Sequence, residues 1–68
     1  MNEDVFNMST RKFLKRVGVT AQRSIEVAIR ESLSTGRLKG NEKLPVTITL
    51  TLGRIDLNVV VDGDIELE

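Results

Sequence analysis

The amino-acid sequence predicts an α+β fold in which a two-helix hairpin packs on one face of a three-stranded antiparallel β-meander. Three observations predict this fold. Amphipathic helical patterns cover residues 3–17 and 20–35, apolar and polar residues alternate over 44–52 and 55–61, and a short alternating segment follows at 65–67. The expected order is α-α-β-β-β, and we expect residues 1–68 to form one small domain.

Each predicted helix has a capping residue and an apolar stripe. Asn2 can cap the first helix and Gly18 can end it in a left-handed conformation, after which Thr20 caps the second helix and Gly36 closes it. At about 100° per residue, one side of each helix collects the apolar residues. The first stripe holds Phe6, Thr10, Phe13, Leu14 and Val17, and the second holds Ala21, Ile25, Ala28, Ile29 and Leu33. We expect both phenylalanines to face the sheet.

The strongest β signal is a hairpin between Leu44 and Val61. Apolar residues alternate there with Pro45, Thr47, Thr49 and Thr51 on the first strand, and the alternation resumes after Gly53-Arg54. A two-residue type II′ turn at Gly53-Arg54 would place every apolar residue on one face. The predicted pairs are Leu52 with Ile55, Leu50 with Leu57, Ile48 with Val59, and Val46 with Val61.

A second reversal is predicted at Asp62-Gly63-Asp64. A two-residue turn at Asp62-Gly63 would put Ile65 on the polar face, whereas a three-residue loop over 62–64 would put Ile65 and Leu67 on the apolar face. The second alternative is favoured because it buries both residues. It makes 65–67 a third strand.

Composition limits how such a chain is stabilised. Single cores below roughly 70 to 80 residues seldom supply more than about 3 to 5 kcal/mol, and this chain has 68 residues without Cys or His. Disulfides and soft-metal sites are therefore excluded, which leaves oligomerisation as the expected stabilising device. No basic leader or apolar run of about 18 residues is present, so a cytoplasmic protein without membrane contact is expected.

Charges are sorted along the chain although its net charge is zero. Residues 11–39 carry eight basic and two acidic side chains, a net charge of +6, while residues 54–68 carry one basic and five acidic side chains, a net charge of −4. Two interpretations follow. The basic helical part and the acidic strand part attract each other within or between molecules, or the basic face binds phosphates.

The sequence contains no catalytic, cofactor or metal signature. Histidine, cysteine, tyrosine and tryptophan are all absent, and no serine, threonine or lysine has a base at triad-like spacing, so no enzymatic activity is predicted. Alternate acidic residues close the chain, but their spacing is not that of a calcium loop: Asp62, Asp64, Glu66 and Glu68. No metal site and no cofactor are expected.

Two functional hypotheses remain. The first is a non-enzymatic protein–protein interaction module that forms a homodimer by pairing the first strand across a two-fold axis, since Thr47, Thr49 and Thr51 leave that edge uncharged. With three strands in each copy, the paired sheet would have six. The alternative is nucleic-acid binding through the basic helical face, namely Arg11, Lys12, Lys15, Arg16, Arg23 and Arg30.

Several short sequence runs also resemble a family of short, uncharacterised bacterial proteins of about this length. The runs are Met1-Asn2-Glu3-Asp4, Phe6-Asn7-Met8-Ser9, Arg11-Lys12-Phe13-Leu14-Lys15, Val17-Gly18-Val19-Thr20, Gln22-Arg23, Gly36 with Leu38-Lys39-Gly40, and Leu44-Pro45. The resemblance covers nearly the whole chain. It implies a compact bacterial module of unassigned activity and no catalytic or binding residues.

Overall fold

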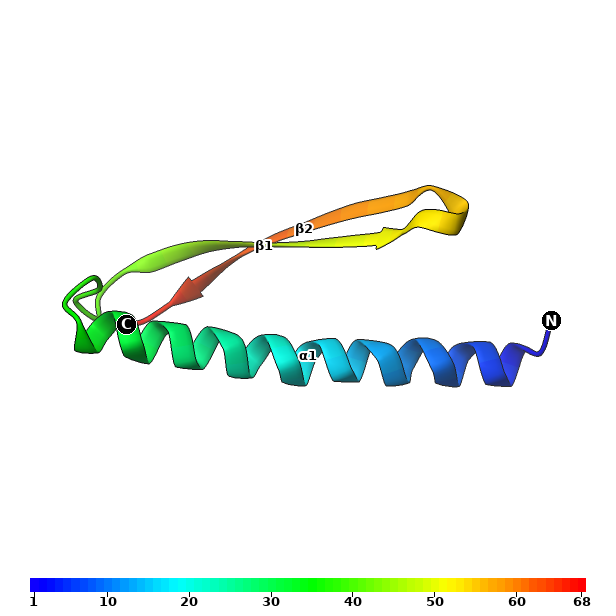
Figure 1. Cartoon of the computed structure of the whole chain (residues 1–68), viewed down its shortest axis with the longest axis horizontal. Helices are drawn as coiled ribbons and strands as arrows, with labels where there is room; N and C mark the ends of the chain where they lie inside the picture. Colours follow the sequence, from blue (N-terminus) through cyan, green and yellow to red (C-terminus); the bar gives the residue numbers. More distant parts are fainter. The chain divides into compact units, whose positions relative to one another are not determined.

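The computed structural model describes all of residues 1–68 and contains one long helix followed by a β-hairpin (Figure 1). Helix α1 spans Glu3–Ser34, strand β1 spans Lys43–Leu52, and strand β2 spans Leu57–Glu66, with a short 3-10 turn, η1, at Gly53–Ile55. The chain divides into two units, Met1–Arg37 and Leu38–Glu68. They are called here the helical unit and the hairpin unit.

The predicted pair of helices is wrong, because α1 continues through Gly18 without interruption. Gly18 does not have the positive φ that would end a helix there. A break would leave the N–H and C=O groups of two new helix ends unpaired, whereas one mid-helix glycine costs only about 1 kcal/mol relative to alanine. The two predicted stripes also join on one helix, since Val17 and Ala21 are four residues apart and lie about 40° apart around its axis.

Both ends of α1 follow the sequence signals. The side-chain oxygen of Asn2 accepts a hydrogen bond from the backbone N–H of Val5 at 3.1 Å, which confirms the predicted N-terminal cap. Glu3 and Asp4 occupy the first turn, where carboxylates interact favourably with the helix dipole. At the other end, Gly36 has φ +82°, so the predicted closure of the helix by a left-handed glycine is confirmed.

The hairpin forms as predicted, but with a longer turn and a register shifted by two residues. Leu52 lies opposite Leu57 and Leu50 opposite Val59, so the predicted pairs are wrong. The loop takes four residues because η1 is followed by Asp56 in the left-handed conformation, with φ 54°, a conformation that Asp tolerates better than most residues. Since the side-chain period of a strand is two, a two-residue shift changes every partner and keeps every face.

The predicted second reversal and third strand are also wrong. Strand β2 runs straight through Asp62, Gly63 and Asp64 and pairs with β1 up to Glu66, in a sheet of only two strands. The two aspartates make contacts across the hairpin: Thr47 Oγ1 donates to Asp62 Oδ1 at 3.0 Å, and Lys43 Nζ lies 3.9 Å from Asp64 Oδ2. These contacts hold both aspartates within the straight strand, so no turn forms between them.

No side chain is buried within either unit, so neither the helix nor the hairpin has a core of its own. Phe6 and Phe13 are 51% and 57% exposed, and that both face the sheet stays a prediction. A single helix or a single two-stranded hairpin cannot enclose a core alone. The observed fold class is therefore α+β with one helix and one hairpin.

Candidate interaction surfaces

The first candidate surface is the apolar stripe of α1, formed by Phe6, Phe13, Leu14, Val17, Ala21, Ile25, Ala28, Ile29 and Leu33. The single helix joins the two predicted stripes into one that runs nearly its whole length. Val17, Ala21, Ile25 and Ile29 are half-buried, while the aromatic residues nearer the N-terminus are largely exposed. Exposed phenylalanines in a continuous stripe indicate a contact surface rather than isolated surface residues.

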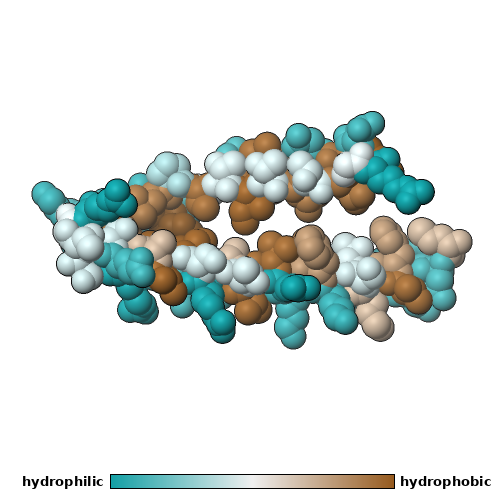
Figure 2. All heavy atoms as spheres, in the orientation of Figure 1, coloured by the Kyte–Doolittle hydropathy of each residue, from teal (hydrophilic) through white to brown (hydrophobic).

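The second candidate surface is the apolar face of the hairpin. Its members alternate with polar residues on both strands and lie side by side in the observed register: Leu44, Val46, Ile48, Leu50, Leu52, Leu57, Val59, Val61 and Ile65. Apolar side chains are conspicuous along the hairpin in Figure 2. Ile48, Val59 and Val61 are 43%, 41% and 59% exposed. An antiparallel sheet normally packs such a face on other elements, so this face requires a cover.

The two outer edges of the hairpin differ in their side chains. The N–H of Leu67 donates to the carbonyl of Glu42 at 3.0 Å, so the residues of β1 that bond to β2 are the even-numbered ones. The backbone groups of the odd-numbered residues therefore point to the free edge, and Pro45, which has no N–H, falls among them. On β1 this edge carries Thr47, Thr49 and Thr51. On β2 the corresponding residues are Asn58, Val60, Asp62, Asp64 and Glu66.

All six residues of the predicted basic face lie on α1. At about 100° per residue, Lys12, Arg16, Arg23 and Arg30 fall within about 40° of one another and form one row about 27 Å long. Arg11 and Lys15 lie to one side of this row. None of the six forms an ion pair, since the ion pair of the structure is Lys43 with Asp64. Polar side chains project from α1 in Figure 2.

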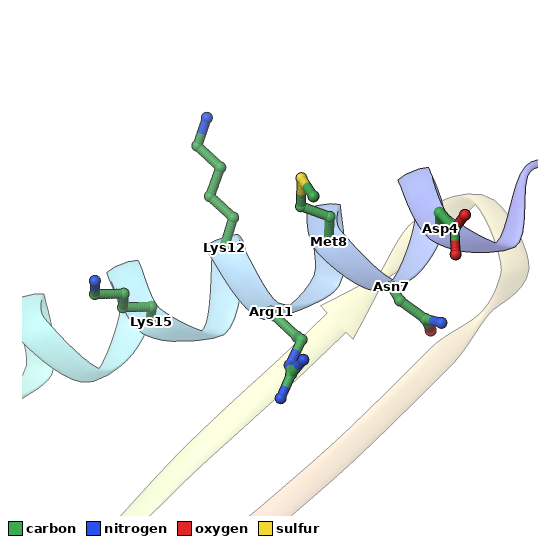
Figure 3. Close-up of a pocket in the computed structure, with 6 residues that line it drawn as sticks. All are labelled: Asp4, Asn7, Met8, Arg11, Lys12 and Lys15. Carbon is green, nitrogen blue, oxygen red and sulfur yellow. The ribbon is translucent and has the colours of Figure 1, made fainter.

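The hollows in the surface of α1 are each lined by residues of this helix alone. One hollow is lined by Asp4, Asn7, Met8, Arg11, Lys12 and Lys15, all from the helix itself (Figure 3). In that view Lys12 and Met8 point to one side of the helix, whereas Arg11 and Asn7 point to the other. A binding pocket needs polar groups that converge from several elements, so this hollow is an open groove between neighbouring side chains.

Glu42 organises the segment that leads into β1, and sequence analysis missed it. Its carboxylate accepts hydrogen bonds from the backbone N–H groups of Lys39 at 2.8 Å, Gly40 at 2.9 Å and Asn41 at 3.2 Å. These bonds, with that of Lys39 first, lower the pKa of Glu42 although partial burial opposes the shift. Gly40 adopts φ +105°, which lets the backbone fold around the carboxylate. An acidic residue just after a Gly-Asn pair was the available signal.

No three acidic side chains come together as a possible metal ligand set, and no helix combines the length and apolarity needed to cross a membrane. The features that define this chain are thus one amphipathic helix and one amphipathic hairpin, each with an apolar face that it does not cover by itself. The chain belongs to a family of unknown function, DUF6494, whose model matches residues 1–68. This match confirms the expected resemblance to a family of short uncharacterised proteins. Neither the curated proteins nor the solved structures contain a match to the chain.

Proposed function

We propose that this protein is a non-enzymatic protein–protein interaction module that works as an obligate homodimer. The observation that carries the proposal is that the helical unit and the hairpin unit each present an apolar face that the unit does not cover by itself. A continuous exposed apolar face of this kind is typical of a protein–protein interaction site. The composition supports a non-enzymatic role, because the chain lacks His, Cys and Tyr.

A second copy of the same chain suits these surfaces on two grounds. Each copy brings two apolar surfaces, the stripe on α1 and the face of the hairpin, so two copies supply four apolar surfaces that can cover one another. Each copy also brings a basic segment at 11–39 and an acidic segment at 54–68, and the whole chain is neutral. Contacts between unlike segments of two copies therefore join opposite charges without a net charge on the dimer.

Sedimentation equilibrium over a wide range of protein concentrations tests this proposal. The expected result is a mass twice that of the 7.6 kDa chain, together with a thermal unfolding midpoint, followed by circular dichroism, that rises with protein concentration. A chain that stays at the monomer mass and unfolds cooperatively at a midpoint independent of concentration contradicts the proposal.

The row of Lys12, Arg16, Arg23 and Arg30 along one side of α1 favours a second function, nucleic-acid binding. A row of cations about 27 Å long on one side of a single helix lets several of them contact phosphates at the same time. Binding of a duplex DNA in a gel-shift assay should weaken steeply with salt because counterions are released. Replacing the four residues by Gln should abolish the shift, whereas replacing Lys43 and Arg54 of the hairpin unit by Gln should leave it unchanged. Absence of any shift at low salt contradicts this function.

A further inference from the structure

The free edge of β1 identifies how two copies join, an inference that rests on the proposed function. Two strands alone make a marginal sheet, and a third or fourth strand supplies the missing stability. Both edges of this hairpin have unpaired N–H and C=O groups, but they are not equivalent. Asp62, Asp64 and Glu66 line the outer edge of β2 and would repel one another if two such edges met. Between Lys43 and Gly53 the edge of β1 carries Pro45 and three threonines, all of them uncharged.

We propose that β1 pairs with β1 of a second copy in antiparallel orientation, with the two-fold axis passing between the two Thr49 residues. Thr47 then lies opposite Thr51 of the partner subunit, and the reverse pair forms by symmetry. The threonines exchange about six interchain backbone hydrogen bonds in this register. The sheet has four strands, instead of the six expected from a three-stranded meander.

Pro45 selects this register among its neighbours. Moving the two-fold axis toward Thr47 would set Pro45 opposite Thr49 or Thr51 of the partner subunit, where its missing N–H would remove a hydrogen bond from each half of the interface. Moving the axis toward Thr51 would take the outermost threonine pairs beyond the ends of the strands. Only an axis at Thr49 pairs all three threonines and leaves both prolines outside the paired segment.

The same register also continues the apolar face across the junction. Residues directly opposite in antiparallel strands share a face, so Ile48 lies beside Leu50 of the partner subunit and Val46 beside Leu52 of the partner subunit. The two hairpin faces then form one apolar surface of four strands. The threonines of the two copies form a ladder on the opposite, polar face, where β-branched hydroxyl pairs are favourable.

The matched pair Thr49→Lys and Val60→Lys tests the edge. Thr49 and Val60 lie opposite each other in the hairpin, on the same polar face, and differ in which edge they occupy. Thr49→Lys places two ammonium groups at the two-fold axis and should raise the dimer dissociation constant by about tenfold or more. Val60→Lys should leave it within about twofold. Sedimentation equilibrium measures both values.

Single-cysteine variants test the register of the two β1 strands without destabilising the dimer. The chain has no cysteine, so Thr49→Cys introduces one thiol, and two such thiols meet at the axis within the distance range that a disulfide spans. Mild oxidation should give a covalent dimer of Thr49→Cys and leave Val60→Cys monomeric on a denaturing gel. Equal behaviour of the Thr49 and Val60 variants in a chain that is dimeric overturns the edge pairing and leaves the proposed function standing. A monomeric wild-type chain overturns both.

Discussion

The helical unit and the hairpin unit differ in how far apart in the sequence their bonded residues lie. In α1 every backbone bond joins residues about four apart, whereas the hairpin unit joins residues as distant as Glu42 and Leu67. Yet the two units are alike in one respect, because each has an apolar face that it cannot bury by itself. Backbone hydrogen bonding within a helix or a hairpin therefore determines which side chains share a face. It does not supply the second element that would bury this face.

The largest expected effect on stability comes from a lysine substitution on β2, where two consecutive residues can be compared. Val59 lies on the apolar face and Val60 on the polar face, and their exposures in one chain are similar, at 41% and 55%. If the apolar face of the hairpin stayed open to solvent, Lys would be tolerated at both positions. Because dimerisation buries the apolar face, Val59→Lys should destabilise the protein by about 2 kcal/mol or more and yield monomers, whereas Val60→Lys should change little. Thermal unfolding and sedimentation of the two variants measure the difference. Equal effects would show that the apolar face stays open to solvent.

Alanine substitutions at two glycines test whether α1 is continuous. They should change the stability of the protein by smaller amounts and in opposite directions. Gly18 is helical and has no atom within 4 Å of an added Cβ, so Gly18→Ala should stabilise the protein by about 1 kcal/mol. Gly36 has φ +82°, so Gly36→Ala should destabilise it by about 1 kcal/mol. Chemical denaturation followed by far-ultraviolet circular dichroism gives both values. If the helix were broken at Gly18, the two substitutions would act in the same direction.

Faces could be predicted from the sequence, and boundaries could not. The stripes of α1 and the apolar face of the hairpin contain the residues expected of them, because periods of 3.6 and 2 are written directly in the order of apolar residues. Glycine permits a turn, so the sequence predicts breaks at Gly18 and at the Asp62-Gly63-Asp64 run. The continuous backbone bonding on either side of each glycine outweighs this conformational freedom, and a Cβ added at Gly63 would lie an ordinary 3.8 Å from Val46 Cγ1. The four-residue turn depends on the left-handed conformation of Asp56, which no alternation of side chains encodes.

The candidate site divides in the same manner. The residue types of the threonine edge and the basic face were apparent from the sequence, and their placement required the structure. The row of Lys12, Arg16, Arg23 and Arg30 exists only because α1 is continuous, since two helices would have pointed the halves of the row in different directions. The difference between the two hairpin edges depends on which backbone groups face outward, and that follows from the bond between Leu67 and Glu42. Glu42 itself was missed because its partners are backbone N–H groups, which residue types do not identify.

The smallest expected effect is a response to acid, which should occur at the start of the hairpin and not at the start of the helix. Both start with a side-chain oxygen that accepts backbone N–H groups, the uncharged amide of Asn2 in α1 and the carboxylate of Glu42 before β1. The pKa of Glu42 is lowered chiefly by its bond from Lys39, so its contribution to stability is present above the ordinary carboxyl pKa and is lost as the pH falls through the lowered, folded value. Acid should therefore loosen the segment before β1. The amide resonances of Lys39, Gly40 and Asn41 should shift together with a midpoint below the ordinary pKa of glutamate. Glu42→Gln keeps an accepting oxygen and removes the titration, so these three amides should no longer shift together at that midpoint. A midpoint at or above the ordinary value would mean that the carboxylate is not held by these N–H groups in solution.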